Sequence, residues 1–186
     1  AIAMLLSLED ELDVKGKCSH GQEAIHFLEN NPAPDIILSD IEMPQMSGLD
    51  LAVHVASHHI ASHVVLMTTF AKPGYIKRAM SVGVKGFVLK EADSDYLIAS
   101  IKDVIAGKVV ISTELALMAL DDNNPLSEKE MSALKLASEG MKTHDIASAL
   151  FLSEGTVRNY LSEAISKLNA TNRIDAARIA QQKGWL

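Results

Sequence analysis

The stretch that decides the fold is Asp35-Ile36-Ile37-Leu38-Ser39-Asp40-Ile41-Glu42-Met43-Pro44-Gln45-Met46-Ser47-Gly48. It begins with a short apolar run that is typical of a buried parallel strand. Asp40 follows at the carboxyl end of this strand, where ligands and chemistry collect in open α/β sheets. Pro44 then forces a turn, and Ser47 and Gly48 suit the start of the next helix. Asp40 is therefore a candidate reactive carboxylate, although a carboxylate that only caps a strand end is an equal alternative on this stretch alone.

The composition is that of an ordinary globular protein. The 186 residues are enough for two modest domains, and 48% are hydrophobic and 22% charged. The single cysteine, Cys18, excludes an internal disulfide framework and a cysteine metal knuckle, and it favours a reducing cytoplasm. We expect Cys18 to be a small buried residue. No apolar run approaches 18 residues, and the apolar N-terminal stretch lacks the basic region of a signal peptide, so we expect no membrane partner.

The net charge of −7 is unevenly distributed along the chain. Residues 1–107 hold 8 Lys/Arg against 14 Asp/Glu, whereas residues 126–186 hold 8 against 7. The last third is thus the least acidic part, and it suits an anionic partner better than the rest of the chain.

The first 107 residues alternate between predicted strands and helices. The predicted strands span residues 36–39, 64–68 and 86–90, with a weaker candidate at 14–18. The predicted helices span residues 1–8, 21–30, 47–58, 73–82 and 93–106. This alternation predicts a doubly wound, flavodoxin-like parallel sheet with helices on both faces.

The pattern changes after Gly107, and no further strand is evident. A short apolar helix is expected at 113–120, followed by the polar break Asp121-Asp122-Asn123-Asn124-Pro125. Four helices are then predicted at 127–138, 143–150, 153–168 and 172–183, the first with a Ser/Glu capping box. The sequence therefore predicts an α/β domain at 1–107, a linker with a short helix at 108–125, and a smaller all-α domain at 126–186.

Three chemically active residues fall at the ends of separate predicted strands: Asp40, Thr68 and Lys90. The carboxyl ends of parallel strands share one edge of a sheet, so a carboxylate, a hydroxyl and an ammonium can meet there around a small anion. A phosphoryl group transferred to Asp40 would need such partners. Each residue alone has a bland explanation, but the three together favour a site.

These residues resemble the receiver domain of two-component response regulators over nearly all of residues 1–107. The matching motifs are Asp40-x-x-Met43-Pro44-x-x-x-Gly48, Thr68 and Gly83-Val84-Lys85-Gly86-Phe87-Val88-Leu89-Lys90. The resemblance implies that Asp40 is the phosphoacceptor, that Thr68 and Lys90 contact the phosphate, and that Phe87 is a switching aromatic. It also implies a Mg²⁺ cofactor bound by Asp40 and the backbone carbonyl of Glu42.

The sequence departs from the receiver pattern at its start. Receivers begin with a strand and a pair of acidic residues that help to hold Mg²⁺, whereas Glu9, Asp10, Glu11 and Asp13 lie beyond the first helix and cannot replace that pair. A doubly wound sheet without its first central strand would expose apolar edges, so we expect truncation or disorder rather than a true loss.

Residues 126–186 resemble the LuxR-type helix-turn-helix of the NarL/FixJ branch of response regulators. The matching segments are Leu126-Ser127-x-Lys129-Glu130, Leu136-Ala137-x-x-Gly140, Asp145-Ile146-Ala147-x-x-Leu150, Leu152-Ser153-x-x-Thr156-Val157-Arg158-Asn159-Tyr160, Lys167-Leu168 and Asn172-Arg173. A recognition helix reads base edges with polar residues near its N-terminus, and arginine pairs with guanine and asparagine with adenine. The predicted DNA-binding residues are thus Arg158, Asn159, Thr156 and Ser162 for bases, with Thr143, Lys167 and Arg173 for phosphates.

The sequence therefore predicts a cytoplasmic response regulator that is phosphorylated by a histidine kinase and then binds inverted-repeat DNA as a homodimer. One alternative is a phosphorylation-independent regulator, because the acidic pair is missing. Another is a haloacid-dehalogenase-type phosphatase, which would need a second Asp where Glu42 stands. His54 and His58 are spaced for metal binding on a helix, but no zinc motif accompanies them, and a solvated helix end explains them equally well.

Overall fold

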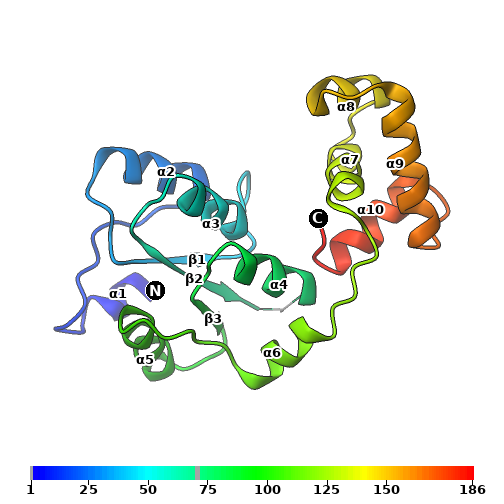
Figure 1. Cartoon of the computed structure of the whole chain (residues 1–186). Helices are drawn as coiled ribbons and strands as arrows, with labels where there is room; N and C mark the ends of the chain where they lie inside the picture. Colours follow the sequence, from blue (N-terminus) through cyan, green and yellow to red (C-terminus); the bar gives the residue numbers. More distant parts are fainter. Residues whose placement is uncertain (1, 70–71) are drawn as a thin grey trace. The chain divides into compact units, whose positions relative to one another are not determined.

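The computed structural model describes residues 2–69 and 72–186 of the chain (Figure 1). The chain forms two compact units: among the described residues, the first comprises residues 2–69 and 76–120, and the second comprises residues 72–75 and 121–186. Within the described residues, no helix combines the length and the apolar character needed to cross a membrane.

The first unit is built on a parallel sheet of β1 (Ile36–Asp40), β2 (His63–Thr68) and β3 (Gly86–Leu89), in the order β1-β2-β3. The register places Asp40 opposite Met67 and Thr68 opposite Leu89, so the carboxyl ends of the strands lie along one edge. The strands are short and almost wholly apolar because both faces of the sheet are covered. This confirms the predicted doubly wound α/β fold.

Helices cover both faces of this sheet (Figure 1). On one face, α1 (Ile2–Leu6) and α5 (Ser94–Ile105) pack in an apolar cluster with the alternate side chains of β2 and β3. The opposite face carries α2 (Gly21–Asn30), α3 (Gly48–Ser57) and α4 (Pro73–Ser81). The helix predictions agree with these bounds to within a few residues.

The weak strand predicted at residues 14–18 is wrong. These residues belong to no strand, and within the described chain β1 pairs only with β2. An extended segment becomes a strand only when a neighbour completes its hydrogen bonds, and no described segment pairs with this one.

The segment predicted as a linker divides between the two units. Val110 forms a parallel bridge with Gly86 at the outer edge of β3, and α6 (Thr113–Leu120) buries Leu115 in the first unit. By contrast, Asp122 belongs to the second unit, because its carboxylate accepts a hydrogen bond of 2.7 Å from the Trp185 indole. Both of these residues are buried.

The second unit contains α7 (Glu128–Ser138), α8 (Thr143–Leu150), α9 (Glu154–Lys167) and α10 (Arg173–Gln182). Its core is one continuous apolar cluster to which all four helices contribute. A tight turn at Phe151, with φ of 55°, joins α8 to α9 and gives the pair the form of a helix-turn-helix. This confirms the predicted second, all-α domain.

Candidate functional site

The structure brings Asp40 and Lys90 together at the carboxyl edge of the sheet. The Lys90 Nζ donates to Asp40 Oδ2 over 2.8 Å, although 50 positions separate the two residues in the sequence. The side chains keep 34% and 36% of their surface exposed, so the carboxylate is held in place and still open to a reactant. Because each residue ends or follows a separate parallel strand, the sheet itself sets this geometry.

Thr68 lies beside this pair, as the last residue of β2. Its backbone carbonyl accepts a hydrogen bond of 2.9 Å from the Lys90 N–H, which fixes the two residues as neighbours. The residue is only 6% exposed. The three strand-end residues thus supply a carboxylate, a hydroxyl and an ammonium along one short edge.

The loop after Asp40 is tightly constrained. The Gly48 N–H donates to the Ile41 carbonyl over 2.9 Å, and a Cβ at Gly48 would lie only 2.0 Å from the Asp40 carbonyl oxygen. Ser47 caps α3 with a reciprocal capping box to Asp50. Only glycine allows this close approach, so the sequence motif holds the candidate phosphoacceptor in a defined backbone position.

Phe87 lies on β3, two residues before Leu89 at the end of the strand, and it is 1% exposed. Its N–H donates to the Val110 carbonyl over 2.8 Å, which ties the strand to the segment leading into α6. Phe87 and Leu115 also line a cavity of roughly 460 Å³ whose rim includes Tyr96. The Phe87 side chain is therefore packed inside the first unit, next to the segment that leads into α6.

The oxygen ligands for a divalent cation are few. Among the residues that the structure describes, no group of three or more His, Cys, Asp or Glu side chains could hold a metal ion. Mg²⁺ can be bound by one carboxylate together with phosphate oxygens and water, so Asp40 and the Glu42 backbone carbonyl fit it in part. His54 and His58 stack with ring centroids 3.9 Å apart at the end of α3.

Cys18 is half-buried. Burial raises the pKa of its thiol, and the nearby Glu23 carboxylate adds to this. A raised pKa lowers the thiolate fraction, so the residue is poorly suited to nucleophilic chemistry.

In the second unit, α9 presents the predicted base readers to solvent. Arg158, Asn159 and Ser162 are exposed, whereas Val157 and Leu161 are buried in the core. The Arg158 guanidinium lies 3.7 Å from the Glu154 carboxylate, one turn earlier. The helix therefore has one packed face and one polar face, as a recognition helix requires.

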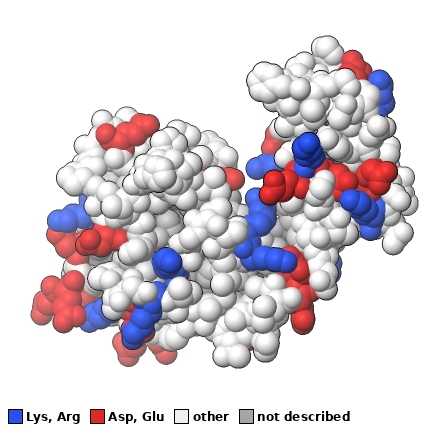
Figure 2. Space-filling view, viewed as in Figure 1, with Lys and Arg blue, Asp and Glu red and all other residues white. Residues whose placement is uncertain are grey.

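The remaining predicted DNA-binding residues have varied surroundings. The Thr156 hydroxyl lies 2.9 Å from the Ser153 hydroxyl at the N-cap of α9. Thr143 and Arg173 are the first residues of α8 and α10, and both are partly exposed. On the face shown in Figure 2, basic and acidic side chains of this unit are interspersed rather than gathered in one basic patch.

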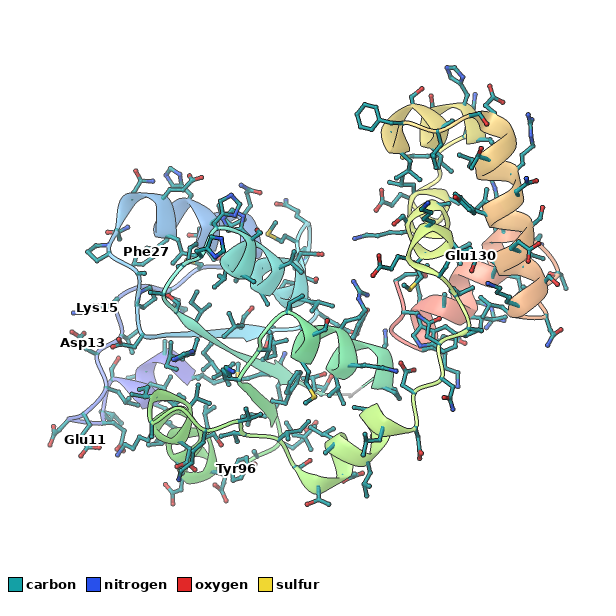
Figure 3. The ribbon with its side chains drawn as sticks, in the orientation of Figure 1. Glu11, Asp13, Lys15, Phe27, Tyr96 and Glu130 are labelled. Atoms are coloured by element: carbon teal, nitrogen blue, oxygen red, sulfur yellow. The ribbon has the colours of Figure 1, made fainter. Side chains whose placement is uncertain are left out.

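Lys167 has a partner that sequence reasoning missed. Its Nζ lies 2.9 Å from both carboxylate oxygens of Glu130, whose side chain is only 7% exposed. Figure 3 shows Glu130 on α7, where it faces α9. Burial alone would raise the Glu130 pKa, but the hydrogen bonds from Lys167 and Ser127 lower it overall. Lys167 therefore joins two helices, and the expected phosphate contact would have to compete with this pair.

The two units together define a class of protein: a strand-edge carboxylate with a lysine and a threonine, joined in one chain to a helix-turn-helix. Residues 1–102 match the response regulator receiver domain family, and residues 124–180 match the family described as bacterial regulatory proteins, luxR family. The chain belongs to the response regulators, with a DNA-binding helix-turn-helix of the LuxR type. The family is one of transcriptional regulators rather than classical enzymes.

Individual relatives agree over the full length of the chain. The transcriptional regulatory proteins YvfU and DesR of Bacillus subtilis are 45% and 40% identical to it; each match covers 100% of this chain and 92% of the relative. Among solved structures, the response regulator ChrA of a heme-sensing system is 26% identical over 100% of this chain and 91% of its own, with a TM-score of 0.53. The RcsB–DNA complex, at 21% identity, covers 97% of this chain and 91% of its own with a TM-score of 0.62, and shows the fold alone.

Proposed function

We propose that this protein is a transcription factor controlled by phosphorylation of Asp40, with a histidine kinase as the donor. The observation that carries the proposal is the contact of 2.8 Å between Lys90 Nζ and Asp40 Oδ2 at the carboxyl edge of the sheet. A partly exposed carboxylate held by an ammonium is arranged for a reaction with an anionic group more than for packing. The relatives' names as transcriptional regulators support the output.

The transfer requires only one bond to form and one to break. A carboxylate oxygen of Asp40 attacks the phosphorus of a phosphohistidine, the P–N bond breaks, and the imidazole leaves with its electron pair and takes up a proton. The protein's own contribution is positioning and charge: Lys90 moves from the carboxylate to the phosphoryl oxygens, and the Thr68 hydroxyl donates to another. Mg²⁺, held by Asp40 and the Glu42 carbonyl with water and phosphate oxygens, supplies further positive charge when it is bound.

The negative charge added at Asp40 can affect the segment between the two units through a chain of contacts. If Lys90 and Thr68 turn toward a phosphoryl group, the end of β3 moves with Lys90, and Phe87 is bonded through its backbone to Val110. Phe87 and Leu115 of α6 line the same cavity, so a repacking of Phe87 alters the surface around Leu115. This supports a phosphorylation-dependent homodimer whose two recognition helices bind one inverted repeat in double-stranded DNA.

The test is to incubate the full chain with a small acyl-phosphate donor and Mg²⁺ and to map the product by mass spectrometry. We expect one acid-stable, base-labile phosphoryl group on Asp40 and none in Asp40→Asn, whose fold should be unchanged by circular dichroism. Equal labelling of both proteins would refute the assignment of Asp40. If neither protein is labelled while the wild type still binds DNA, the phosphorylation-independent alternative is the correct one.

A further inference from the structure

Neither packing nor backbone preference explains the presence of an aromatic residue at position 151, which is Phe151. Phe151 is 95% exposed, more than any other large hydrophobic residue that the structure describes. Its backbone is left-handed, with φ of 55° and ψ of 44°, at the C-cap of α8. That conformation favours glycine or asparagine, and it is strained for a bulky side chain.

The other left-handed positions of the second unit follow the backbone preference. They are Gly140, Asn169 and Gly184, with φ of 86°, 49° and 75°. Asn169 ends α9 in an exposed turn, just as Phe151 ends α8. Because the chain uses glycine or asparagine at these three turns, the phenylalanine at the fourth is not required by the turn itself.

The position of Phe151 indicates what its ring contacts. It lies two residues before Ser153, the N-cap of α9, and therefore between the two helices of the helix-turn-helix. In such a motif the first helix crosses the DNA backbone while the N-terminal turns of the second enter the major groove. The connecting turn then lies beside the wall of that groove, which is formed by deoxyribose and phosphate groups.

We propose that the Phe151 ring packs against the deoxyribose face of one DNA strand at the edge of the major groove, as a sequence-independent positioning contact. The inference rests on the DNA-binding function proposed above and adds to it an apolar contact. The deoxyribose ring offers C–H surface to an aromatic ring, and burying the two together removes apolar area from water. The contact also orients the N-terminus of α9, from which Arg158 reaches the bases.

The test compares the full-length wild type with Phe151→Gly and Phe151→Asn. Two probes are used: a duplex selected from a randomised library by the wild-type protein, and a mixed-sequence duplex of equal length. We expect both variants to raise the thermal midpoint of the second unit by a few degrees, because the turn strain is relieved. We expect them to bind both duplexes about tenfold more weakly. Phe151→Tyr should keep most of the affinity.

Two controls separate the possible outcomes. Asn169→Gly changes a comparable left-handed turn without removing a ring and should leave DNA affinity unchanged. Arg158→Ala should lose affinity mainly for the selected duplex, which tests base reading independently of Phe151. Unchanged affinity of the Phe151 variants would overturn the proposal, as would a loss seen only in transcription with a purified polymerase, which would indicate a protein contact. A wild type that binds neither duplex, even after treatment with the acyl-phosphate donor and Mg²⁺, would overturn the DNA-binding function itself, and this contact with it.

Discussion

The two units each contain a lysine–carboxylate pair that joins distant parts of the chain, and the pairs differ mainly in the burial of the carboxylate. Lys90 and Asp40 are 2.8 Å apart with both side chains about one-third exposed. Lys167 and Glu130 are 2.9 Å apart, but Glu130 is nearly buried and also accepts a hydrogen bond of 2.8 Å from the Ser127 N–H. The Lys90–Asp40 pair, called the open pair below, is partly exposed and involves one carboxylate oxygen. The Lys167–Glu130 pair, called the closed pair, has a buried carboxylate that also completes the N-cap of α7.

The difference shows how the same chemical pair serves two purposes. An exposed pair contributes little to stability, because water competes for both charges. It can therefore exchange its partner when a phosphoryl group arrives. A buried carboxylate is costly to leave without its cation, so the second pair connects α7 to α9 and supports the recognition helix.

The largest expected effect is on the buried pair. Lys167→Ala leaves the Glu130 carboxylate buried without its cation, and we expect the second unit to lose about 3 kcal/mol in free energy of unfolding. Lys90→Ala should change the first unit's stability by less than about 1 kcal/mol. Urea unfolding, followed for each unit, measures both.

The same variant decides the expected phosphate contact. If Lys167 also contacts DNA, the salt dependence of binding by folded Lys167→Ala should have a slope reduced by about one. An unchanged slope would show that Lys167 acts only through Glu130. Equal stability losses in the Lys90 and Lys167 variants would break the contrast between the two pairs.

The second effect concerns base reading. Arg158 is exposed on α9, where its guanidinium lies 3.7 Å from the Glu154 carboxylate. Arg158→Ala should cost roughly 1–3 kcal/mol on a selected duplex and relax the preference at one base pair. Binding of randomised variants of that duplex measures both changes. A uniform loss across all sequences would instead assign Arg158 to the phosphate backbone.

Sequence reasoning predicted the parts of the molecule that depend on local pattern. Each strand end follows from an apolar run that stops at a polar residue, so Asp40, Thr68 and Lys90 could be placed on one edge before the structure was known. The capping box from Ser127 to Glu130 is equally local, and the structure contains it. The predicted switch residue Phe87 is buried on β3, the strand that ends just before Lys90.

The rest depends on contacts that no local pattern encodes. The partner of Glu130 lies 37 positions away, so only the packing of α7 on α9 reveals it. The segment at 14–18 has strand-like composition, but a strand needs a neighbour, and composition cannot supply one. Phe151 follows a leucine in an ordinary helix ending, and nothing in that pattern predicts a left-handed aromatic residue.

The third effect is on phosphorylation rate. In the proposed function Lys90 stabilises charge on the transferred phosphoryl group, so Lys90→Ala should slow the labelling of Asp40 by a small phosphodonor by about one order of magnitude or more. Lys108→Ala is the matched control, because Lys108 forms a similar exposed pair with Asp103 away from the strand ends. The initial rates of acyl-phosphate formation compare the variants. Equal slowing in both would attribute the effect to net charge rather than to the site.

The smallest effect is a pH dependence to which the closed pair contributes. The Glu130 pKa is lowered: burial opposes this, but the Lys167 and Ser127 hydrogen bonds outweigh it. A carboxyl group whose pKa is lower in the folded state contributes stability above its unfolded pKa, and this contribution is lost as pH falls through the folded pKa. The second unit should therefore lose stability as pH falls below about 4.5, the ordinary glutamate range.

Glu130→Gln should flatten part of this acid limb and lower stability at neutral pH. Some slope should remain, because the Thr171 N–H and Arg178 also lower the pKa of Asp175 in the same unit. Urea unfolding of the second unit between pH 7 and pH 3 measures both proteins. Parallel acid limbs in wild type and Glu130→Gln would show that the Lys167–Glu130 pair is not a source of the second unit's pH dependence.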